Sequence, residues 1–462
     1  MLTSLTAPAF AKTWCIEDGN ITVKAGDTGN DVTQKGETTY GDTDTIITNQ
    51  NKDIASSNTV TIETKDKDDK AKVTFENVNI EAGSGSALTS KGDVTLTLKG
   101  DNSLTGGISD NGSYGLSGIS SNGSLTITGG EKDSLTAQGG SGTYSGGSGI
   151  YSDSLTISGS TVDAKGGNSG NGNYSAGGNG IDSSGRSGSI TISGGSTVTA
   201  NGGNGGSIGG GSGIYSNGSV TISGGTVNAA GGDGQDGSGG YGISSLDVAI
   251  SGGTVTANGG DSKDGYGGDG IHSNDIDLSG SLELTAKAGS PNGKALSQNG
   301  RELDLDTIKD KLGPGAKVTA TDANGETKQV SIPRPVEPEG PVIPEESSSS
   351  SGGGSAAPSA PVSSLPGLTV TDKDGQRISY TSTQSGNTLT VCVGRLTASL
   401  HVSLAALRQL RAEGIETITF QTVLCSTTLS VDELLAMGGE DAEIVLTHHI
   451  RSSTLTVGGK AV

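Results

Sequence analysis

The stretch GIYSNGSVTISGGTVNAAGG, residues 213–232, contains three short pieces in which apolar and polar residues alternate. The pieces are residues 214–216, 220–223 and 226–229. Alternation with a period of two places Val220 and Ile222 on one face of an extended strand and the neighbouring hydroxyl side chains on the other. Each piece therefore predicts a β-strand with one buried face, and none is long enough to be stable alone.

The same order of parts recurs six times, and the isoleucine that opens each copy defines the period. The opening residues are Ile119, Ile150, Ile181, Ile214, Ile243 and Ile271, with spacings of 31, 31, 33, 29 and 28 residues. An LTI-like strand and then a TVxA-like strand follow each of them. A period in this range, without helical or leucine-spaced patterns, is typical of a solenoid whose stacked units share one core. Three short strands per unit predict an all-β fold, a parallel β-helix.

The composition agrees with a narrow core. The 462 residues include 81 Gly, and only 30% are hydrophobic and 3% aromatic. A compact domain of the usual kind could not be built from so few large apolar side chains, whereas a solenoid needs only rows of small aliphatic residues. The net charge of −21 opposes binding to nucleic acid or to anionic lipid. No membrane-spanning stretch is visible in the sequence.

Composition shifts divide the chain into six segments. Residues 1–11 end in Ala-Phe-Ala, the small-x-small pattern of a secretory cleavage site, and we interpret them as a signal-peptide remnant of a bacterial extracellular or cell-surface protein. A solenoid needs an atypical unit at each end to cover its open core. In this chain, a Pro/Ser/Gly-rich segment that is typical of a linker follows the solenoid. The remaining segments are an N-terminal cap at 12–58, repeats at 59–290, a C-terminal cap at 291–332, the disordered linker at 333–366 and a small α+β domain at 367–462.

The last segment has its own pattern of strands and helices. Helices are expected at 404–413 and 431–437, and strands at 388–393, 399–402, 416–420 and 443–447. Cys392 and Cys425 fall on neighbouring expected strands. Outside the cell they could form one disulfide, and the alternative is two buried free thiols.

A tyrosine stands in nearly every Gly-rich loop ahead of the opening isoleucine. These residues are Tyr114, Tyr144, Tyr174, Tyr241 and Tyr266, and Ile208 takes the place in the remaining loop. Stacked at the spacing of β-strands, about 4.8 Å, the tyrosines would form a ladder on one side of the solenoid. Aromatic faces beside Asn, Asp and Ser suit the binding of sugars. The alternative is that each ring only covers the glycine backbone of its neighbour.

Acidic residues concentrate in the last two copies, and one run resembles a metal-binding repeat. The residues from 231 to 236 match the GGxGxD start of a calcium-binding nonapeptide, so Asp233 and Asp236 are candidate calcium ligands. The expected hydrophobic position is Ser238 and no second copy follows, which favours ordinary turn aspartates. The sequence indicates no other cofactor.

The LTIxGG and TVxAxGG motifs of residues 59–290 resemble those of glycine-rich right-handed parallel β-helix proteins secreted by Gram-positive gut-type bacteria. Such proteins have a pectate-lyase-like fold and are often labelled as containing carbohydrate-binding domains. The resemblance implies a right-handed coil and a surface or secreted location. Because the shared motif positions are structural, the resemblance assigns no catalytic residue.

We therefore expect a secreted or cell-surface, non-enzymatic protein that binds cell-wall or host glycans through its Tyr-bearing loops. A polysaccharide lyase or hydrolase is the alternative, and it would require Asp247, Asp269 and Asp275 to converge with a basic residue in one cleft. A third possibility is a spacer that presents residues 367–462. The sequence leaves the oligomeric state open.

Overall fold

The computed structural model describes residues 12–333 and 368–461, apart from short gaps. The gaps are residues 27, 65–68, 171, 173, 186–187, 373–375, 379, 386, 394, 396, 413, 423–425, 438–442, 449–452 and 458–459. The expected signal-peptide remnant and nearly all of the expected linker lie outside the described residues. The chain divides into two compact units, Met1–Pro338 and Glu339–Val462, and each is described by itself.

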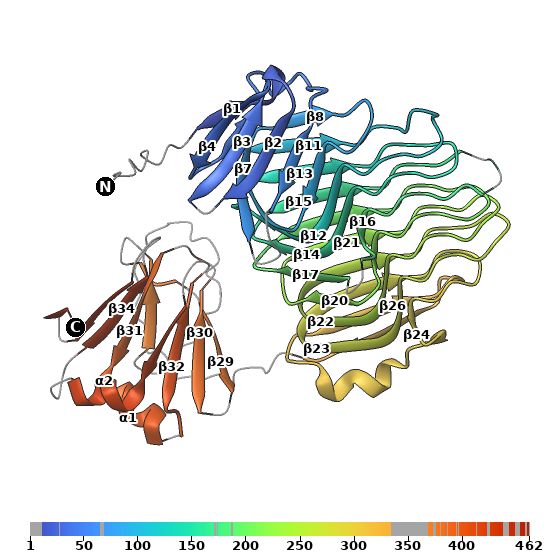
Figure 1. The fold of residues 1–462 in the computed structure, drawn as a ribbon. Coiled ribbons are helices and arrows are strands. Elements are labelled where there is room, and N and C mark those ends of the chain that lie inside the picture. The colour runs from blue at the N-terminus through green and yellow to red at the C-terminus, as the bar shows by residue number, and fades with distance from the viewer. Residues whose placement is uncertain are drawn as a thin grey trace, which may run out of the picture. The chain divides into compact units, whose positions relative to one another are not determined.

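The first unit is a parallel β-solenoid of about 12 turns, which confirms the predicted fold class (Figure 1). Strands of successive turns pair side by side, so that three parallel sheets run along the solenoid axis. We call them the first, second and third sheets, in the order in which a repeat passes through them. The long strands β12 (Ile119–Thr128), β14 (Ile150–Ser158), β22 (Ile243–Asn258) and β23 (Ile271–Lys287) turn corners and join more than one sheet.

The remaining strands each belong to one sheet. The first sheet also contains β2 (Ile21–Gly26), β6 (Val60–Glu63), β9 (Leu88–Lys91), β16 (Ile181–Ser183), β19 (Ile214–Ser216) and β24 (Leu296–Gln298). The second contains β1 (Thr13–Cys15), β5 (Ile46–Thr48), β7 (Lys70–Glu76), β10 (Asp93–Lys99), β17 (Ser189–Ser193) and β20 (Ser219–Ile222). The third contains β8 (Asn79–Glu81), β11 (Asp101–Thr105), β13 (Ser134–Gln138), β15 (Thr161–Lys165), β18 (Thr197–Asn201), β21 (Thr226–Ala230) and β26 (Lys317–Thr321).

The register across turns aligns equivalent residues of the repeat. Ile150 pairs with Ile119 on one side and Ile181 on the other, and the other opening isoleucines continue the row. All six are fully buried. This stacking supplies the core that no single repeat could form, as the period of the sequence predicted.

A row of buried serines, which the sequence patterns did not reveal, holds the corner between the first and second sheets. Each lies two residues after an opening isoleucine and donates a hydrogen bond to a backbone carbonyl near the corner of the preceding turn. Ser245 Oγ, for example, donates to the carbonyl oxygen of Gly218 at 2.8 Å. The row includes Ser152, Ser183, Ser216, Ser245 and Ser273. Small hydroxyl side chains are therefore part of the interior, because they satisfy carbonyl groups where the strand ladder is interrupted.

The coils extend beyond the expected limits of 59–290, because β1 and β2 already pair in parallel with β5 and β6. Antiparallel strands cover both ends. At the N-terminal end, β3 (Gly29–Gln34) pairs with β2, and β4 (Glu37–Asp42) pairs with β3. At the C-terminal end, β25 (Arg301–Glu302) covers β24 and β27 (Thr327–Ser331) covers β26, beside the 3-10 helix η2 (Leu305–Lys311). The antiparallel partners occupy the backbone groups that the end strands β2, β24 and β26 would otherwise leave open to pairing with another chain.

Between the third sheet and the first sheet of the following turn, the chain makes an excursion that starts and ends with a pair of glycines. We call these pairs the outgoing and returning glycines. Figure 1 shows the excursions running side by side at one edge of the coils. Outgoing pairs are residues 139–140, 166–167, 202–203, 231–232 and 259–260, and returning pairs are 146–147, 177–178, 210–211, 239–240 and 267–268.

The outgoing and returning glycines bond directly to one another and form what we call the glycine double layer. Gly178 N donates to the carbonyl oxygen of Gly167 at 2.9 Å, and Gly203 N donates to that of Gly178 at 2.8 Å. The same alternation continues from Gly140 to Gly289. A Cβ atom on Gly166 or Gly178 would overlap a neighbouring carbonyl group. Glycine is abundant here because two layers of backbone touch with no room for a side chain.

The second unit is a small α+β domain with two sheets. One sheet has the order β28 (Leu368–Thr371), β31 (Ala398–Ser403), β34 (Glu443–His448), β35 (Ser453–Val457) and β36 (Lys460–Ala461). The other has β29 (Thr381–Ser385), β30 (Thr388–Cys392), β32 (Thr417–Gln421) and β33 (Ser426–Ser430).

Two helices, α1 (Leu404–Ala412) and α2 (Val431–Met437), lie where the sequence places them. Gly414, with a φ of 90°, follows α1 as a C-terminal glycine. Ser430 Oγ accepts a hydrogen bond from Glu433 N at the start of α2. The core of this unit includes the fully buried Leu407 and Phe420.

Candidate functional site

The excursions of the solenoid end in tips beyond the glycine double layer, and large exposed side chains gather there. Nine large hydrophobic side chains are exposed among the described residues, and six of them lie in these tips. They are Ile108, Tyr114, Tyr144, Tyr174, Ile208 and Tyr266. Tyr174 is the most exposed, at 79%. The tips therefore present aromatic and aliphatic groups to solvent on an otherwise polar molecule.

The four tip tyrosines do not form the continuous ladder that the sequence suggested. The row aligned across turns runs from Tyr114 through Ser145, Ala176, Gly209 and Ser238, and the backbone bond from Gly239 to the carbonyl of Tyr266 continues it. Tyr144 and Tyr174 stand one and two residues before this aligned position. The loops differ in length, so equivalent residues drift out of line. Only Tyr114 and Tyr144 are in ring contact among the described tips, with centroids 6.2 Å apart.

Tyr241 lies elsewhere, at the junction of the glycine double layer with the first sheet. Its half-buried ring stacks on His272 of the next turn, with centroids 4.5 Å apart and an interplanar angle of 17°. Burial, and secondarily the charge of Asp269, raises the pKa of the Tyr241 hydroxyl. Tyr241 is thus a packing residue of this junction and does not belong to the tips.

Asp269 is the centre of this junction. Its carboxylate is nearly buried, receives a hydrogen bond from Lys294 N at 2.7 Å and lies 2.7 Å from His272 Nδ1. Burial alone would raise its pKa, but the hydrogen bonds from His272 and the backbone outweigh this, and the pKa of Asp269 is lowered. The cluster ties the segment before β24 to the preceding turn. In the sequence, the only indication of this cluster is that Asp269 stands three residues before His272, the one histidine of the repeats.

Glu302 on β25 belongs to the same region. Its carboxylate accepts hydrogen bonds from Ala295 N and Leu296 N, at 3.2 and 3.0 Å. Burial raises the pKa of this carboxyl, and the neighbouring Asp269 adds to the shift. Both acids therefore hold backbone amides of the terminal turn in place.

The carboxylates that an enzyme would need do not converge. Asp247 and Asp275 pair side by side on β22 and β23. Asp269 precedes β23, on the first-sheet side of the corner at Ser273, whereas Asp275 lies beyond that corner in the second sheet. No group of three or more His, Cys, Asp or Glu that could hold a metal occurs within the described part of the chain. The arrangement that would favour a lyase or hydrolase is therefore not formed by these residues.

The candidate calcium ligand Asp233 has a structural partner. Its Oδ1 atom accepts a hydrogen bond from Asp261 N at 2.9 Å, and its own N donates to Asn204 Oδ1 at 2.9 Å. Asn204 N in turn donates to Asn168 Oδ1. The acids and amides that follow the outgoing glycines thus form a ladder, which the recurring GGN and GGD triplets could have revealed. Asp236 is exposed and does not join it.

The candidate disulfide stays a prediction. Cys392 is half-buried at the end of β30, with Sγ 3.5 Å from Gln421 Oε1. Burial raises the pKa of the Cys392 thiol. Cys425 lies outside the described residues.

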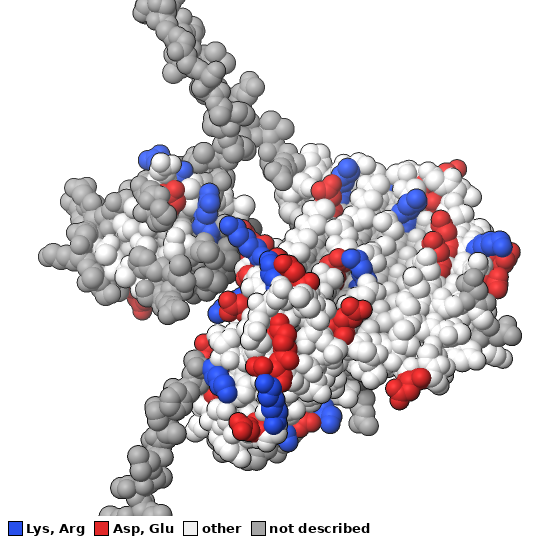
Figure 2. Space-filling model, turned by 90° about the horizontal axis from the view of Figure 1, so that it is seen from above, with Lys and Arg blue, Asp and Glu red and all other residues white. Residues whose placement is uncertain are grey.

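Charged groups are dispersed over the solenoid. Figure 2 shows one face, on which Asp and Glu lie scattered and often beside Lys or Arg, with large areas carrying neither. Glu63, for example, lies 3.5 Å from both Lys24 and Lys91. This face offers no broad basic area for a polyanion.

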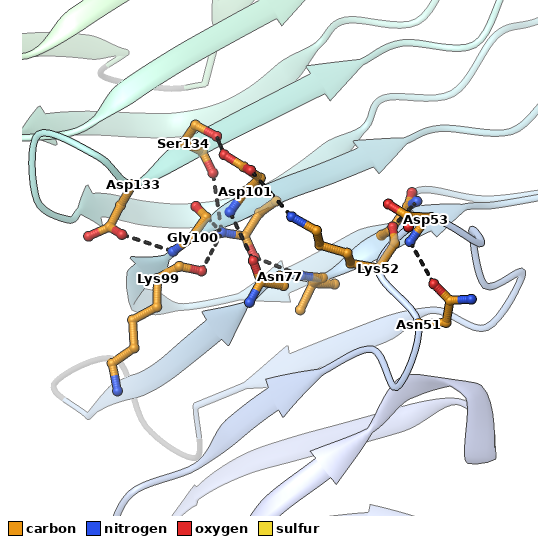
Figure 3. A network of polar contacts seen from close by, with 12 residues as sticks. Asn51, Lys52, Asp53, Asn77, Lys99, Gly100, Asp101, Asp133 and Ser134 are labelled. Atoms are coloured by element: carbon orange, nitrogen blue, oxygen red, sulfur yellow. Dashed lines mark hydrogen bonds and ion pairs between the residues drawn. The ribbon is translucent and has the colours of Figure 1, made fainter.

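A polar hollow of about 380 Å³ lies on the third sheet near the N-terminal end. Figure 3 shows the network around it, in which Lys52 reaches toward Asp101 and Asp101 contacts Ser134. Asn79 and Asn102 also line the hollow. Sequence reasoning missed this site, because its residues come from four successive turns.

Comparison with known proteins assigns this chain to no family. The chain matches no family model, no curated protein and no solved structure. None of the helices in the described ranges is long and apolar enough to cross a membrane. The class defined by the geometry is therefore a capped β-solenoid with aromatic loop tips.

Proposed function

We propose that this protein binds glycans through the tips of its excursions, as a non-enzymatic protein outside the bacterial cell. The observation that carries the proposal is the gathering of six exposed aromatic and aliphatic side chains at the tips. Aromatic rings flanked by hydroxyl and amide groups suit sugars, whose rings have an apolar face and polar edges.

The support beneath the tips favours binding over simple packing. The glycine double layer and the Asn/Asp ladder hold each excursion to the next through short hydrogen bonds. Within the tips, Tyr174 N donates to Ser207 Oγ at 2.7 Å and Tyr144 N donates to the carbonyl oxygen of Ser113 at 2.8 Å. A ring on such a preorganised backbone loses little conformational entropy when a ligand binds.

The negative net charge narrows the ligand class. With 50 acidic and 29 basic residues, the protein repels polyanions at low ionic strength. Neutral polysaccharides of a cell wall or host surface fit better than acidic ones.

A glycan array probed with the full-length chain tests the proposal. We expect signals on neutral polysaccharides that disappear when Tyr114, Tyr144, Tyr174 and Tyr266 are all replaced by Ala. Absence of signal for the wild type, or an unchanged pattern for the fourfold variant, would disprove tip-mediated glycan binding.

A further inference from the structure

The polar hollow is built by side chains that also organise the N-terminal turns, and Figure 3 shows the contacts among several of them. Asn79 Nδ2 donates to the carbonyl oxygen of Lys52 at 2.8 Å, and Asn79 N donates to Asn49 Oδ1 at 2.7 Å. These bonds hold the loop between β5 and β6 against β8. One wall of the hollow is therefore fixed before any ligand arrives.

The opposite wall is formed by Asp101 on β11 and Ser134 on β13. Ser134 Oγ donates to Asp101 Oδ1 at 2.9 Å, and Asp101 N donates to Asn77 Oδ1 at 3.2 Å. Lys52 Nζ lies 3.8 Å from Asp101 Oδ2, with both side chains more than half exposed. An exposed ion pair at this distance is weak, so its charged groups are available to a ligand.

Below these walls, the buried side chain of Asn102 forms hydrogen bonds with backbone groups of two other strands or loops. Its Oδ1 accepts from Val78 N at 2.9 Å, and its Nδ2 donates to the carbonyl oxygen of Ser134 at 3.2 Å. The hollow thus has a rigid floor beneath a polar rim.

The polar and charged side chains that line the hollow favour a ligand with many hydroxyl groups. The lining residues are all polar or charged, with carboxylates, one ammonium group, amides and hydroxyls, and with no aromatic or aliphatic residue among them. Two acids, Asp53 and Asp101, face one base, Lys52, so the local charge is negative. An acidic sugar would be repelled, and a neutral or amine-bearing one accepted.

The hollow also opens onto a polar row along the third sheet. Ser103 and Thr136 of the lining are aligned in register, and the row continues along the axis at the spacing of strands, about 4.8 Å per turn. Its further members are Asp163, Thr199, Asn228, Thr256 and Thr285. A chain of sugars could extend from the hollow along this row.

We infer that the hollow binds the terminal unit of a neutral or amine-bearing oligosaccharide whose following units lie along the polar row. Asp101 accepts hydrogen bonds from the ligand, and Lys52 donates to it. This inference deepens the proposed glycan binding and rests on it, but it concerns a surface other than the tips.

Calorimetric titration of the full chain with cello-oligosaccharides, glucosamine oligomers and oligogalacturonate tests the inference. We expect the first two to bind and oligogalacturonate not to. Asp101→Asn should weaken glucosamine-oligomer binding about tenfold, because a charge-assisted hydrogen bond is lost. Ser134→Ala should weaken the binding of both the cello-oligosaccharides and the glucosamine oligomers. Asp247→Asn is the matched control, since it removes the same charge from an exposed position on another sheet.

The outcomes separate this inference from the proposal for the tips. Unchanged titrations for Asp101→Asn and Ser134→Ala, or preferred binding of oligogalacturonate, would overturn the role of the hollow. If the fourfold tyrosine variant loses array signals while those two variants titrate normally, the tips bind glycans and the hollow does not. Loss of short-oligosaccharide binding only in the hollow variants supports the inference. A wild type that binds no sugar in either assay refutes both.

Discussion

The amide of Gly203 donates a hydrogen bond of 2.8 Å to the carbonyl oxygen of Gly178, although the two residues lie on opposite layers of the excursions. Repeated along the solenoid, this contact turns Gly-rich segments that would otherwise be flexible loops into an ordered double layer. The exposed tyrosines are carried at its outer margin. The stability of the layer and the function of the tips can therefore be tested separately.

Replacement of a glycine inside the double layer should destabilise the solenoid. In Gly178→Ala the new Cβ would overlap the carbonyl group of Gly147, and we expect a loss of about 3 kcal/mol in the free energy of unfolding. Gly224→Ala is the control, because open space surrounds that position. Urea denaturation followed by circular dichroism measures both. Equal midpoints for the two variants would contradict the tight packing.

Single replacements at the tips should weaken glycan binding without affecting stability. Tyr144→Ala and Tyr266→Ala each remove an exposed ring, and we expect about a threefold to tenfold loss of affinity, as for other aromatic contacts. Tyr40→Ala serves as the control, since this tyrosine is 76% exposed on β4, away from the tips. Affinity is measured by titration with a polysaccharide that is positive on the array. An equal loss for Tyr40→Ala would show that the effect is not specific to the tips.

The contribution of Asp269 should depend on pH. Since the folded-state pKa is below the unfolded value of about 3.9, the carboxylate stabilises the fold above that value. This stability is lost as the pH falls through the folded-state pKa. At pH 7, Asp269→Asn should reduce the free energy of unfolding by about 1–3 kcal/mol, and the difference should vanish in strong acid. Denaturation of both proteins across this pH range measures it, and a pH-independent difference would refute the assignment.

The Asn/Asp ladder predicts different results for two substitutions at one position. Asp233→Asn should leave the midpoint of thermal unfolding unchanged, because the amide oxygen of Asn can accept the hydrogen bond from Asp261 N. Asp233→Ala should cost about 1 kcal/mol. Thermal unfolding with and without calcium measures both. If Asp233→Asn were destabilised only when calcium is present, Asp233 would be a calcium ligand after all.

Much of the fold could be predicted from the sequence because the interior of a solenoid is a local pattern. Period-two burial placed Val220 and Ile222 inside, and the recurring opening isoleucine implied that equivalent residues stack. In the second unit, Gly414 and Ser430 marked the limits of two helices through capping contacts within a few residues.

The sequence alone determined the repeat, the solenoid, the location of the loops and the separate α+β unit. Only the tertiary structure decided that the tip tyrosines are out of line, that Tyr241 stacks on His272, and that Lys52 and Asp101 meet across a hollow. The physical reason is that these contacts join residues about 30 or more positions apart. They depend on the register and length of neighbouring excursions, which no local pattern of residues records.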